Sequence, residues 1–418
     1  MLLALLSLPA LAAGLPQHLP LVRQTIHRRG DFVDLNRIAS SAESLRYKYG
    51  FKAASQLGRR ASEDTFGVIN QGSDLRYLTT LSVGTPPQSF NVILDTGSSD
   101  LWFATTDCQD CPSGTPEFNT SQSSTLNTTS ETVLLQYGTG NATGTLLQDT
   151  VSLGSYTIPN QAFTGVTNMG LNGLINGTTT GILGLAFENL AYSGATPFWQ
   201  SLINAGELSS PVMAFYFKRL GVNITGSTTD THPGGTFTLG GTNSSFYKGD
   251  IEFHSVPNVT GLERTFWLQT LTGLTVNGNS LDLGDANNNT AVIDTGSSFI
   301  GGPTAAVQAF WAQIDGSLDL SEFGVNGFWG FPCATNVTAT LAFGGRAWTI
   351  PADDINLGQA AEGICVGSIF DARRGVILGE GFPNWLIGDA FLKNVYTVYR
   401  AGDNPAVGFA ELADGLRD

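Results

Sequence analysis

Two aspartates that each follow an apolar stretch are the residues best suited to chemistry in this sequence. Asp95 follows residues 92–94 (Val-Ile-Leu), Asp294 follows residues 291–293 (Ala-Val-Ile), and each opens the same sequence, Asp-Thr-Gly-Ser-Ser. A carboxyl group after a buried strand is costly as an isolated charge, so it needs hydrogen bonds or a partner that shares its proton. Two such carboxyls brought together hold one proton between them at acidic pH. The pair therefore predicts general acid–base chemistry on a trapped water molecule.

The residues after each aspartate can supply what such a carboxyl needs. Gly97 and Gly296 allow a sharp turn and close approach of the backbone. Backbone N–H groups and hydroxyl groups of the same loops can hold the carboxylate oxygens. The hydroxyl groups belong to Thr96, Ser98, Thr295 and Ser297. Two unrelated turns are the alternative, but a second copy 199 positions after the first favours a duplicated site.

With this pair of motifs, the chain resembles the pepsin-like aspartic proteases. The resemblance implies a bilobal fold in which each lobe brings one aspartate to a cleft between them. It also implies hydrolysis of peptide bonds, with Asp95 and Asp294 as the catalytic residues and the neighbouring Thr, Gly and Ser residues as their support. The expected partners are extended peptide substrates, the chain's own propeptide and pepstatin-type inhibitors, and we expect a monomer. No metal and no organic cofactor is implied.

Composition independently favours an all-β fold with few short helices. Glycine makes up 51 of 418 residues, about 12% against a usual ~7%. Serine, threonine and asparagine are also abundant, which is typical of short strands and tight turns, and long helical periodicity is scarce. We expect short helices over residues 196–206, with Thr196 as N-cap and Pro197 at the first helical position, and over residues 303–314.

The N-terminus predicts entry into the secretory pathway. Residues 1–13 are uncharged and apolar, with a small-x-small pattern at residues 10–12 (Ala-Leu-Ala), which is typical of a signal peptide. This stretch is too short to span a bilayer, and no later run reaches about 18 apolar residues. We therefore expect a secreted protein, with a vacuolar location as the less favoured alternative. A buried N-terminal strand is the other interpretation of these residues.

The net charge of −15 is unevenly distributed. Residues 14–60 contain nine Lys/Arg and three Asp/Glu, whereas the chain from Ala61 onward contains eleven Lys/Arg and 32 Asp/Glu. The two parts attract each other, and the acidic part is a poor match for nucleic acid or an anionic membrane. Acid would relieve its self-repulsion by protonating carboxylates, although generic solubility also explains the charge.

The basic segment 14–60 resembles the inhibitory propeptide of the family. In that family a lysine of a Lys-Tyr pair lies on the catalytic carboxylates, and Lys48 is the candidate here. The segment ends at Arg-Arg, residues 59–60, which resembles a kexin-type processing site and predicts a mature chain from about Ala61. The dibasic pair at residues 28–29 is a competing site, and autocatalytic cleavage in acid is a further alternative.

A glycine-rich stretch 42 residues after Asp95 resembles the flap that closes over substrate in this family. It begins with Tyr137, Gly138 and Thr139, and glycine there suits a mobile hairpin tip. Seen alone, the stretch would be an ordinary turn. In the family the flap tyrosine is held by a tryptophan, which Trp102 matches. Asn141 departs from the small residue expected, and it opens a glycosylation sequon whose glycan would narrow the cleft.

A second repeat favours two related lobes. Residues 181–185 and 385–389 each contain two apolar residues followed by glycine, 87 and 92 positions after Gly97 and Gly296. In the family such a strand packs beside each catalytic loop, and two ordinary buried strands are the alternative. We expect an N-terminal lobe over residues 61–245, which includes the flap, and a C-terminal lobe over residues 246–418.

Four cysteines suit two disulfides in a secreted chain, with three pairings open. The resemblance implies Cys108–Cys111 and Cys333–Cys365, although the spacing of the first pair is tighter than in pepsin. A redox-active Cys-x-x-Cys lacks the expected βαβ context. Zinc is disfavoured because the four histidines are scattered. Nine glycosylation sequons suggest a glycoprotein, although a chain rich in Ser, Thr and Asn also forms sequons by chance.

Two other functions compete with the peptidase. The first is a catalytically inactive homologue that acts as a peptide- or protein-binding glycoprotein. Such proteins usually lose an aspartate, a loop glycine or the flap tyrosine, and this chain retains all three. The second is a glycosidase that uses two carboxylates, which explains neither the duplicated motif nor the flap.

Overall fold

The protein is mainly β, which confirms the predicted fold class. The computed structural model describes residues 17–24, 33, 35–49, 76–137, 140–170, 175, 178–219, 231–258, 264–284, 289–373 and 383–417. The predicted signal peptide, the dibasic sites, Ala61, and Gly138 and Thr139 of the flap lie outside the described residues.

The largest sheet has thirteen strands and runs through both halves of the molecule. In spatial order its strands are β11 (Tyr247–Ser255), β26 (Ala406–Leu412), β25 (Val395–Arg400), β9 (Val212–Phe217), β10 (Thr231–Leu239), β1 (Gln17–Gln24), β2 (Tyr77–Val83), β3 (Gln88–Asp95), β8 (Thr179–Gly184), β4 (Leu101–Ala104), β7 (Tyr156–Met169), β6 (Gly140–Leu153) and β5 (Asn127–Tyr137).

Three smaller sheets build the C-terminal lobe. One contains β12 (Leu268–Thr270), β15 (Thr290–Ile293), β24 (Trp385–Ile387), β16 (Ile300–Gly302) and β23 (Ile369–Asp371). The second contains β14 (Asn279–Ser280), β13 (Gly273–Val276), β19 (Ala339–Ala342) and β20 (Ala347–Ile350). The third contains β17 (Leu318–Asp319), β18 (Trp329–Pro332), β22 (Ile364–Gly367) and β21 (Asn356–Ala361).

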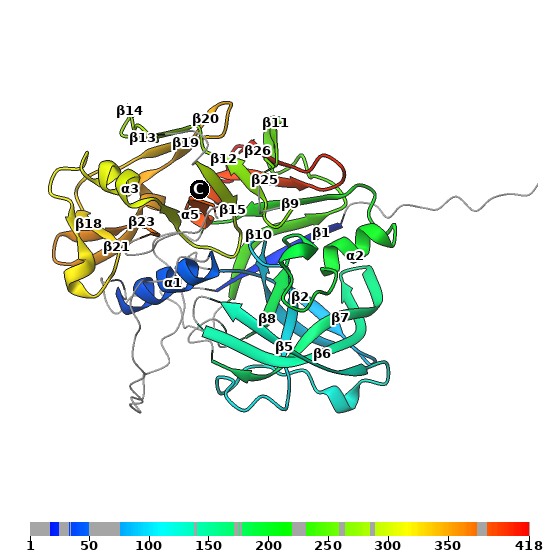
Figure 1. Ribbon diagram of the computed structural model, residues 1–418. Helices are drawn as coiled ribbons and strands as arrows, with labels where there is room; N and C mark the ends of the chain where they lie inside the picture. Colours follow the sequence, from blue (N-terminus) through cyan, green and yellow to red (C-terminus); the bar gives the residue numbers. More distant parts are fainter. Residues whose placement is uncertain are drawn as a thin grey trace, which may run out of the picture.

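Two lobes lie side by side (Figure 1), with β2–β8 in the N-terminal lobe and β12–β24 in the C-terminal lobe. The same strand pairing occurs in both. In the N-terminal lobe β3 is parallel to β8, and β4 is antiparallel to β8 and parallel to β7. In the C-terminal lobe β15 is parallel to β24, and β16 is antiparallel to β24 and parallel to β23. The two apolar-apolar-Gly repeats therefore lie beside the strands that lead to Asp95 and Asp294, as predicted.

The α-helices of the described residues are short apart from the first. They are α1 (Leu35–Lys48), α2 (Phe198–Asn204), α3 (Thr304–Trp311), α4 (Ala352–Ile355) and α5 (Asp389–Leu392). Short 3-10 helices occupy Thr120–Gln122, Glu188–Leu190 and Leu320–Phe323.

The predicted start of α2 was wrong by one residue. Pro197, not Thr196, is the N-cap, and no side chain caps this helix. The Thr196 hydroxyl instead donates a hydrogen bond to Glu188 Oε1, 2.9 Å away, so a tertiary contact outweighs the local capping preference. Helix α3 is also shorter than predicted and begins after Pro303.

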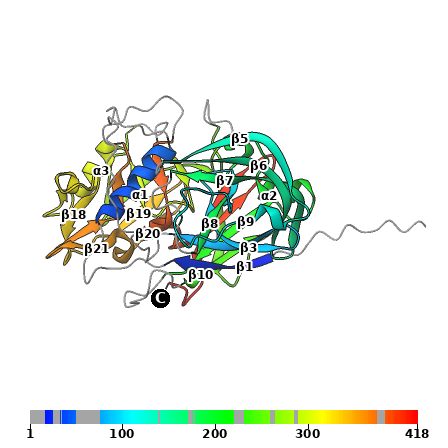
Figure 2. The same ribbon diagram turned by 90° about the horizontal axis from the view of Figure 1, so that it is seen from below.

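Helix α1 was not predicted, although it carries a helical pattern. Its buried apolar residues are Ile38, Ala42 and Leu45, spaced by four and three. They pack with apolar residues of the C-terminal lobe, among them Phe299 and Phe370. On its other side α1 contacts β5, so it lies across the junction of the two lobes (Figures 1 and 2). The helix is thus stabilised mainly by tertiary burial.

The structure contains the disulfides Cys108–Cys111 and Cys333–Cys365. In the described part of the chain, no helix is both long enough and apolar enough to cross a membrane.

Candidate active site

The two aspartates of the duplicated motif lie together at the junction of the lobes. Asp95 is the last residue of β3, Asp294 directly follows β15, and the side chains are buried. Lys48, the last residue of α1, lies between them: its Nζ is 2.6 Å from Asp95 Oδ1 and 2.8 Å from Asp294 Oδ2. One ammonium group therefore binds both carboxylates.

Each carboxylate is held by its own loop in the same way. The Gly97 N–H donates to Asp95 Oδ1 over 3.0 Å, and the Ser98 hydroxyl donates to Oδ2 over 2.5 Å. The equivalent donors to Asp294 are the Gly296 N–H, 2.8 Å from Oδ1, and the Ser297 hydroxyl, which binds Oδ2. These bonds fix the orientation of both carboxylates before any ligand binds.

Thr96 and Thr295 join the two loops rather than binding the carboxylates. The Thr96 N–H donates to Thr295 Oγ1 (3.1 Å), and the Thr295 N–H donates to Thr96 Oγ1 (3.0 Å). Each hydroxyl then donates to a carbonyl oxygen of the opposite lobe, Thr96 to Ile293 and Thr295 to Leu94, both over 2.9 Å. The lobes are therefore joined by reciprocal buried hydrogen bonds directly beneath the carboxylates.

Glycine is required two positions after each aspartate because the opposite carboxyl group approaches so closely. A Cβ added to Gly97 would lie 2.7 Å from Asp294 Cγ, and one added to Gly296 would lie 2.3 Å from Asp95 Oδ1. A side chain at either position would separate the carboxylates.

Two tyrosines belong to this site although the sequence reasoning gave them no role. The Tyr49 hydroxyl donates to Asp294 Oδ2, and burial followed by the charge of Asp294 raises its pKa well above the ordinary value. Its position directly after Lys48 was the available signal. The Tyr399 hydroxyl lies 3.3 Å from the Ile293 carbonyl oxygen and 3.5 Å from Thr96 Oγ1, at the hydrogen bonds that join the lobes. No local motif marks Tyr399.

The two carboxyl groups differ in acidity. Burial disfavours the charged form of both. For Asp95 this effect outweighs the nearby Lys48 ammonium, and its pKa is raised. For Asp294, Lys48 together with hydrogen bonds from Ser297 and Tyr49 outweighs burial and lowers the pKa to about 2. The site therefore combines a carboxyl group that readily keeps its proton with one that readily loses it.

The hairpin of β5 and β6 places Tyr137 beside the site. Tyr137 pairs with Gly140 across the hairpin, and its buried hydroxyl accepts a 2.8 Å hydrogen bond from Trp102 Nε1. Asn141, the departure noted in the sequence, is exposed. The end of β5 is thus anchored, at the turn of the hairpin, by a hydrogen bond between two aromatic side chains.

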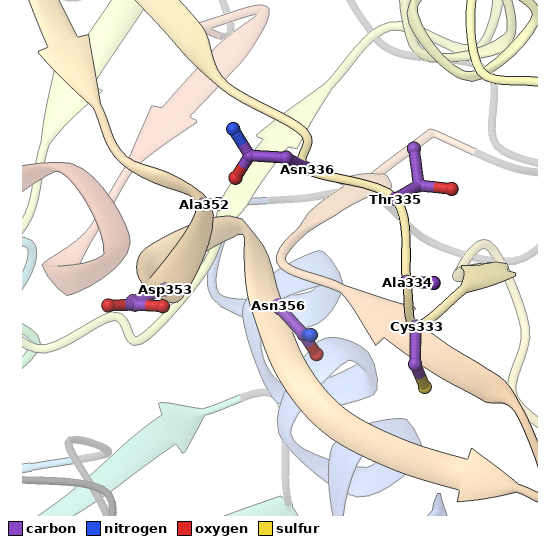
Figure 3. A pocket seen from close by; sticks show the side chains of 7 residues that line it. All are labelled: Cys333, Ala334, Thr335, Asn336, Ala352, Asp353 and Asn356. Atoms are coloured by element: carbon purple, nitrogen blue, oxygen red, sulfur yellow. The ribbon is translucent and has the colours of Figure 1, made fainter.

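No cluster of three or more His, Cys, Asp or Glu residues suited to a metal occurs among the described residues. A separate polar hollow on the C-terminal lobe lies beside the Cys333–Cys365 disulfide and the start of α4 (Figure 3). Asn336, an exposed sequon asparagine, lines it together with Cys333, Ala334, Thr335, Ala352, Asp353 and Asn356. None of these residues forms a described hydrogen bond with Asp95 or Asp294.

Comparison with known proteins finds matches over most of the chain. The family model for eukaryotic aspartyl protease matches residues 76–412. Major aspartyl peptidase 1 of Cryptococcus neoformans var. grubii is 38% identical over 376 residues, which cover 88% of this chain and 74% of the relative. An aspartic protease of Phaffia rhodozyma is 32% identical over 385 residues (91% and 86%), and pepsin A of Rhinolophus ferrumequinum is 30% identical over 423 residues (98% and 99%).

Replacing one of the joining threonines should destabilise the fold. Thr295→Val leaves the Thr96 N–H and the Leu94 carbonyl oxygen without their buried partner, which should cost about 2–4 kcal/mol of unfolding free energy. Urea unfolding at neutral pH measures the change. Thr80→Val, which replaces an exposed strand threonine, should stay within about 0.5 kcal/mol of the parent. Equal stability of the two variants would contradict the assigned role of Thr295.

Proposed function

The chain belongs to the eukaryotic aspartyl protease family and is an aspartic endopeptidase, and from this premise we propose that Asp95 and Asp294 are its catalytic pair and that it is made as a secreted, inactive precursor. The observation that carries the catalytic proposal is the convergence of two buried carboxylates, one from each lobe, on the single ammonium group of Lys48.

In the proposed mechanism, a water molecule takes the place of the Lys48 ammonium between Asp95 and Asp294 once α1 has left. Without that cation the two carboxyl groups cannot both ionise cheaply, so they hold one proton between them in acid. The ionised group removes a proton from the water as its oxygen attacks the scissile carbonyl carbon. The protonated group gives its proton to the carbonyl oxygen, which forms a neutral gem-diol.

Collapse of the gem-diol completes the reaction. The carboxyl group that took the proton from water transfers it to the leaving nitrogen, while a gem-diol hydroxyl returns its proton to the other carboxylate. The C–N bond breaks, a new carboxylic acid and amine result, and the pair again holds one proton. The donors from Gly97, Ser98, Gly296 and Ser297 keep both carboxylates in place throughout.

The β5–β6 hairpin is proposed as the flap over an extended peptide substrate, with Gly138 and Thr139 at its tip and Tyr137 facing the cleft. The hydrogen bond from Trp102 to Tyr137 supports this role because it holds one rotamer of the tyrosine ring. A closed flap would exclude water other than the attacking molecule and align the scissile bond.

Residues 14–60 are proposed as the inhibitory propeptide, with Lys48 as the inhibitory residue. Lys48 and Tyr49 together occupy the position that the attacking water and the substrate would need. The burial of α1 against the C-terminal lobe supports the same proposal, because it fixes both side chains over the carboxylates.

Secretion is proposed from the apolar residues 1–13 and is supported by the two disulfides. Maturation near Ala61 would leave an N-terminal lobe over residues 61–245 and a C-terminal lobe over residues 246–418. We propose a monomer that is inhibited by pepstatin-type compounds.

Replacing either aspartate should abolish catalysis while preserving the fold. Asp95→Asn and Asp294→Asn each remove one partner of the shared proton, and we expect cleavage of a denatured protein to fall by a factor on the order of 10³ or more. The assay uses acid-activated protein, with and without pepstatin, between pH about 2 and 7. Asp403→Asn, at an exposed position, is the control and should match the parent. Substantial activity in either site variant would contradict the mechanism, and a folded parent with no cleavage would favour an inactive, peptide-binding homologue.

Lys48→Met should release the precursor from inhibition. Residues 59–60 are changed to Ala-Ala so that the propeptide stays attached, and pepstatin binding is measured against pH. In the parent, Asp95 protonates first as pH falls, because its pKa is raised. The interactions of the Asp294 carboxylate with Lys48 are fully present above pH 3.8, the ordinary pKa of aspartate. They are lost as pH falls toward about 2, the lowered pKa of Asp294. Pepstatin binding should therefore rise only below pH about 4 in the parent. In Lys48→Met these ion pairs are absent, so pepstatin binding should begin at a higher pH than in the parent, and identical pH profiles would refute the role of Lys48.

Trp102→Phe should weaken the attachment of Tyr137 in the proposed flap while keeping an aromatic ring in contact with it. The variant loses the hydrogen bond to the Tyr137 hydroxyl, which should lower kcat/KM by about 5- to 10-fold. Trp348→Phe is the matched control, because the buried Trp348 indole N–H has no hydrogen-bond partner among the residues that the structure describes. Its kcat/KM should stay within about twofold of the parent. Equal losses in the two variants would mean that the flap does not depend on this bond.

A further inference from the structure

Arg46 of α1 is bound in a small niche of the C-terminal lobe. Its Nη2 donates hydrogen bonds to the carbonyl oxygens of Asn326 and Asp371, both over 2.7 Å. Its guanidinium carbon lies 5.5 Å from the centre of the Phe370 ring, within the range of a cation–π interaction. The side chain is only 5% exposed. The niche thus binds a guanidinium group through two oxygens and an aromatic ring.

The walls of the niche do not belong to the propeptide. Asn326, Phe370 and Asp371 all come from the C-terminal lobe. The acidic partner of the guanidinium, in contrast, is Glu43 of α1 itself, whose Oε1 accepts a 2.5 Å hydrogen bond from Arg46 Nη1. When α1 leaves, Arg46 and Glu43 leave together, and the two carbonyl oxygens and the ring remain. Carbonyl oxygens that lose a buried donor need a replacement.

The niche is held open by hydrogen bonds within the C-terminal lobe. The Asp371 N–H donates to the Gly327 carbonyl oxygen over 2.8 Å, which joins the two segments that supply the binding oxygens. The Asp371 carboxylate points elsewhere and accepts hydrogen bonds from the Thr304 hydroxyl and the Arg373 N–H. Gly327 has a φ of +77°, and a Cβ there would lie 2.2 Å from Arg46 Nη2. Space for the guanidinium therefore depends on glycine at this position.

We propose that this niche is a subsite for an arginine side chain of peptide substrates in the mature enzyme. The inference rests on the proposed function, because it requires residues 14–60 to depart. Helix α1 binds the niche and the catalytic pair at the same time, because Arg46, which fills the niche, lies two positions before Lys48. A planar, weakly hydrated guanidinium suits the Phe370 ring better than an ammonium does. The acidic balance of the chain from Ala61 onward also favours a cationic side chain.

The test compares arginine with citrulline, which keeps the planar shape but removes the charge. Acid-activated enzyme is given quenched fluorescent peptides that share one apolar scissile pair. Arginine, citrulline or lysine is placed in turn at each position from four before to three after that bond. At one position kcat/KM should be at least tenfold higher for arginine than for citrulline, with lysine between them. Equal values for arginine and citrulline at every position would overturn the proposal.

Two glycine variants locate the subsite. Gly327→Asn tolerates the positive φ, but its Cβ would lie in the niche and only 2.6 Å from the Asp371 carbonyl oxygen, which must move, so its arginine-to-citrulline ratio should fall to about one. Gly363→Asn is the matched control, because Gly363 has a φ of +73° and no atom of the described residues lies within 4 Å of an added Cβ. Its ratio should equal that of the parent. If thermal melting shows that Gly327→Asn is unfolded, Phe370→Leu replaces it, with an expected drop in the ratio of at least threefold. A ratio that persists in the niche variant would overturn the assignment.

Binding measurements separate failure of this inference from failure of the proposed function. If no peptide is cleaved, the catalytic proposal fails, and the niche is then tested by fluorescence polarisation with the same peptides bound to processed protein. The arginine peptide should bind at least tenfold more tightly than its citrulline counterpart. Equal affinities would overturn the niche independently of any catalytic activity.

Discussion

The reciprocal hydrogen bonds between Thr96 and Thr295 are the constraint on which the site depends. Each threonine binds the backbone of the opposite lobe, so neither aspartate loop has a defined position without the other. The carboxylates above them come from segments almost 200 residues apart. Because the joining bonds are buried, a movement of one lobe relative to the other that breaks them would leave polar groups unpaired. The geometry of the carboxyl pair is therefore a property of the interface between the lobes.

The features that could be predicted from the sequence are those that depend on short sequence motifs, on composition or on repeats. The duplicated Asp-Thr-Gly-Ser-Ser loops identify both carboxylates and their glycines, since close backbone approach requires glycine whatever the rest of the fold. The abundance of glycine and small polar residues was sufficient for the all-β class. The apolar-apolar-Gly repeats were visible from their spacing, and the resemblance to the family implied their place beside the loops.

The features that were missed depend on contacts between distant residues. The pattern of Ile38, Ala42 and Leu45 fits a helix, but only the C-terminal lobe supplies the surface that makes α1 stable. Tyr399 lies beneath the carboxyl pair because β25 passes there, and nothing in its own neighbourhood indicates this. Threonine is a residue type that favours the N-cap position, but the Thr196 hydroxyl group donates its hydrogen bond to the Glu188 carboxylate instead. In all three cases a tertiary partner decides the outcome.

The N-terminal segment packs into the molecule through strand β1 as well as through helix α1. It lies inside the large sheet, antiparallel to β10 along its whole length and to β2 at one end. Cutting the chain after residue 60 would free α1 and β1 covalently, yet β1 would still be hydrogen-bonded between two strands. Its departure would split the sheet and expose two unpaired edges, which are costly and prone to pairing with other chains. Peptide-bond cleavage and escape of the severed segment are therefore separate events, and a nicked but still assembled molecule is the expected intermediate between them.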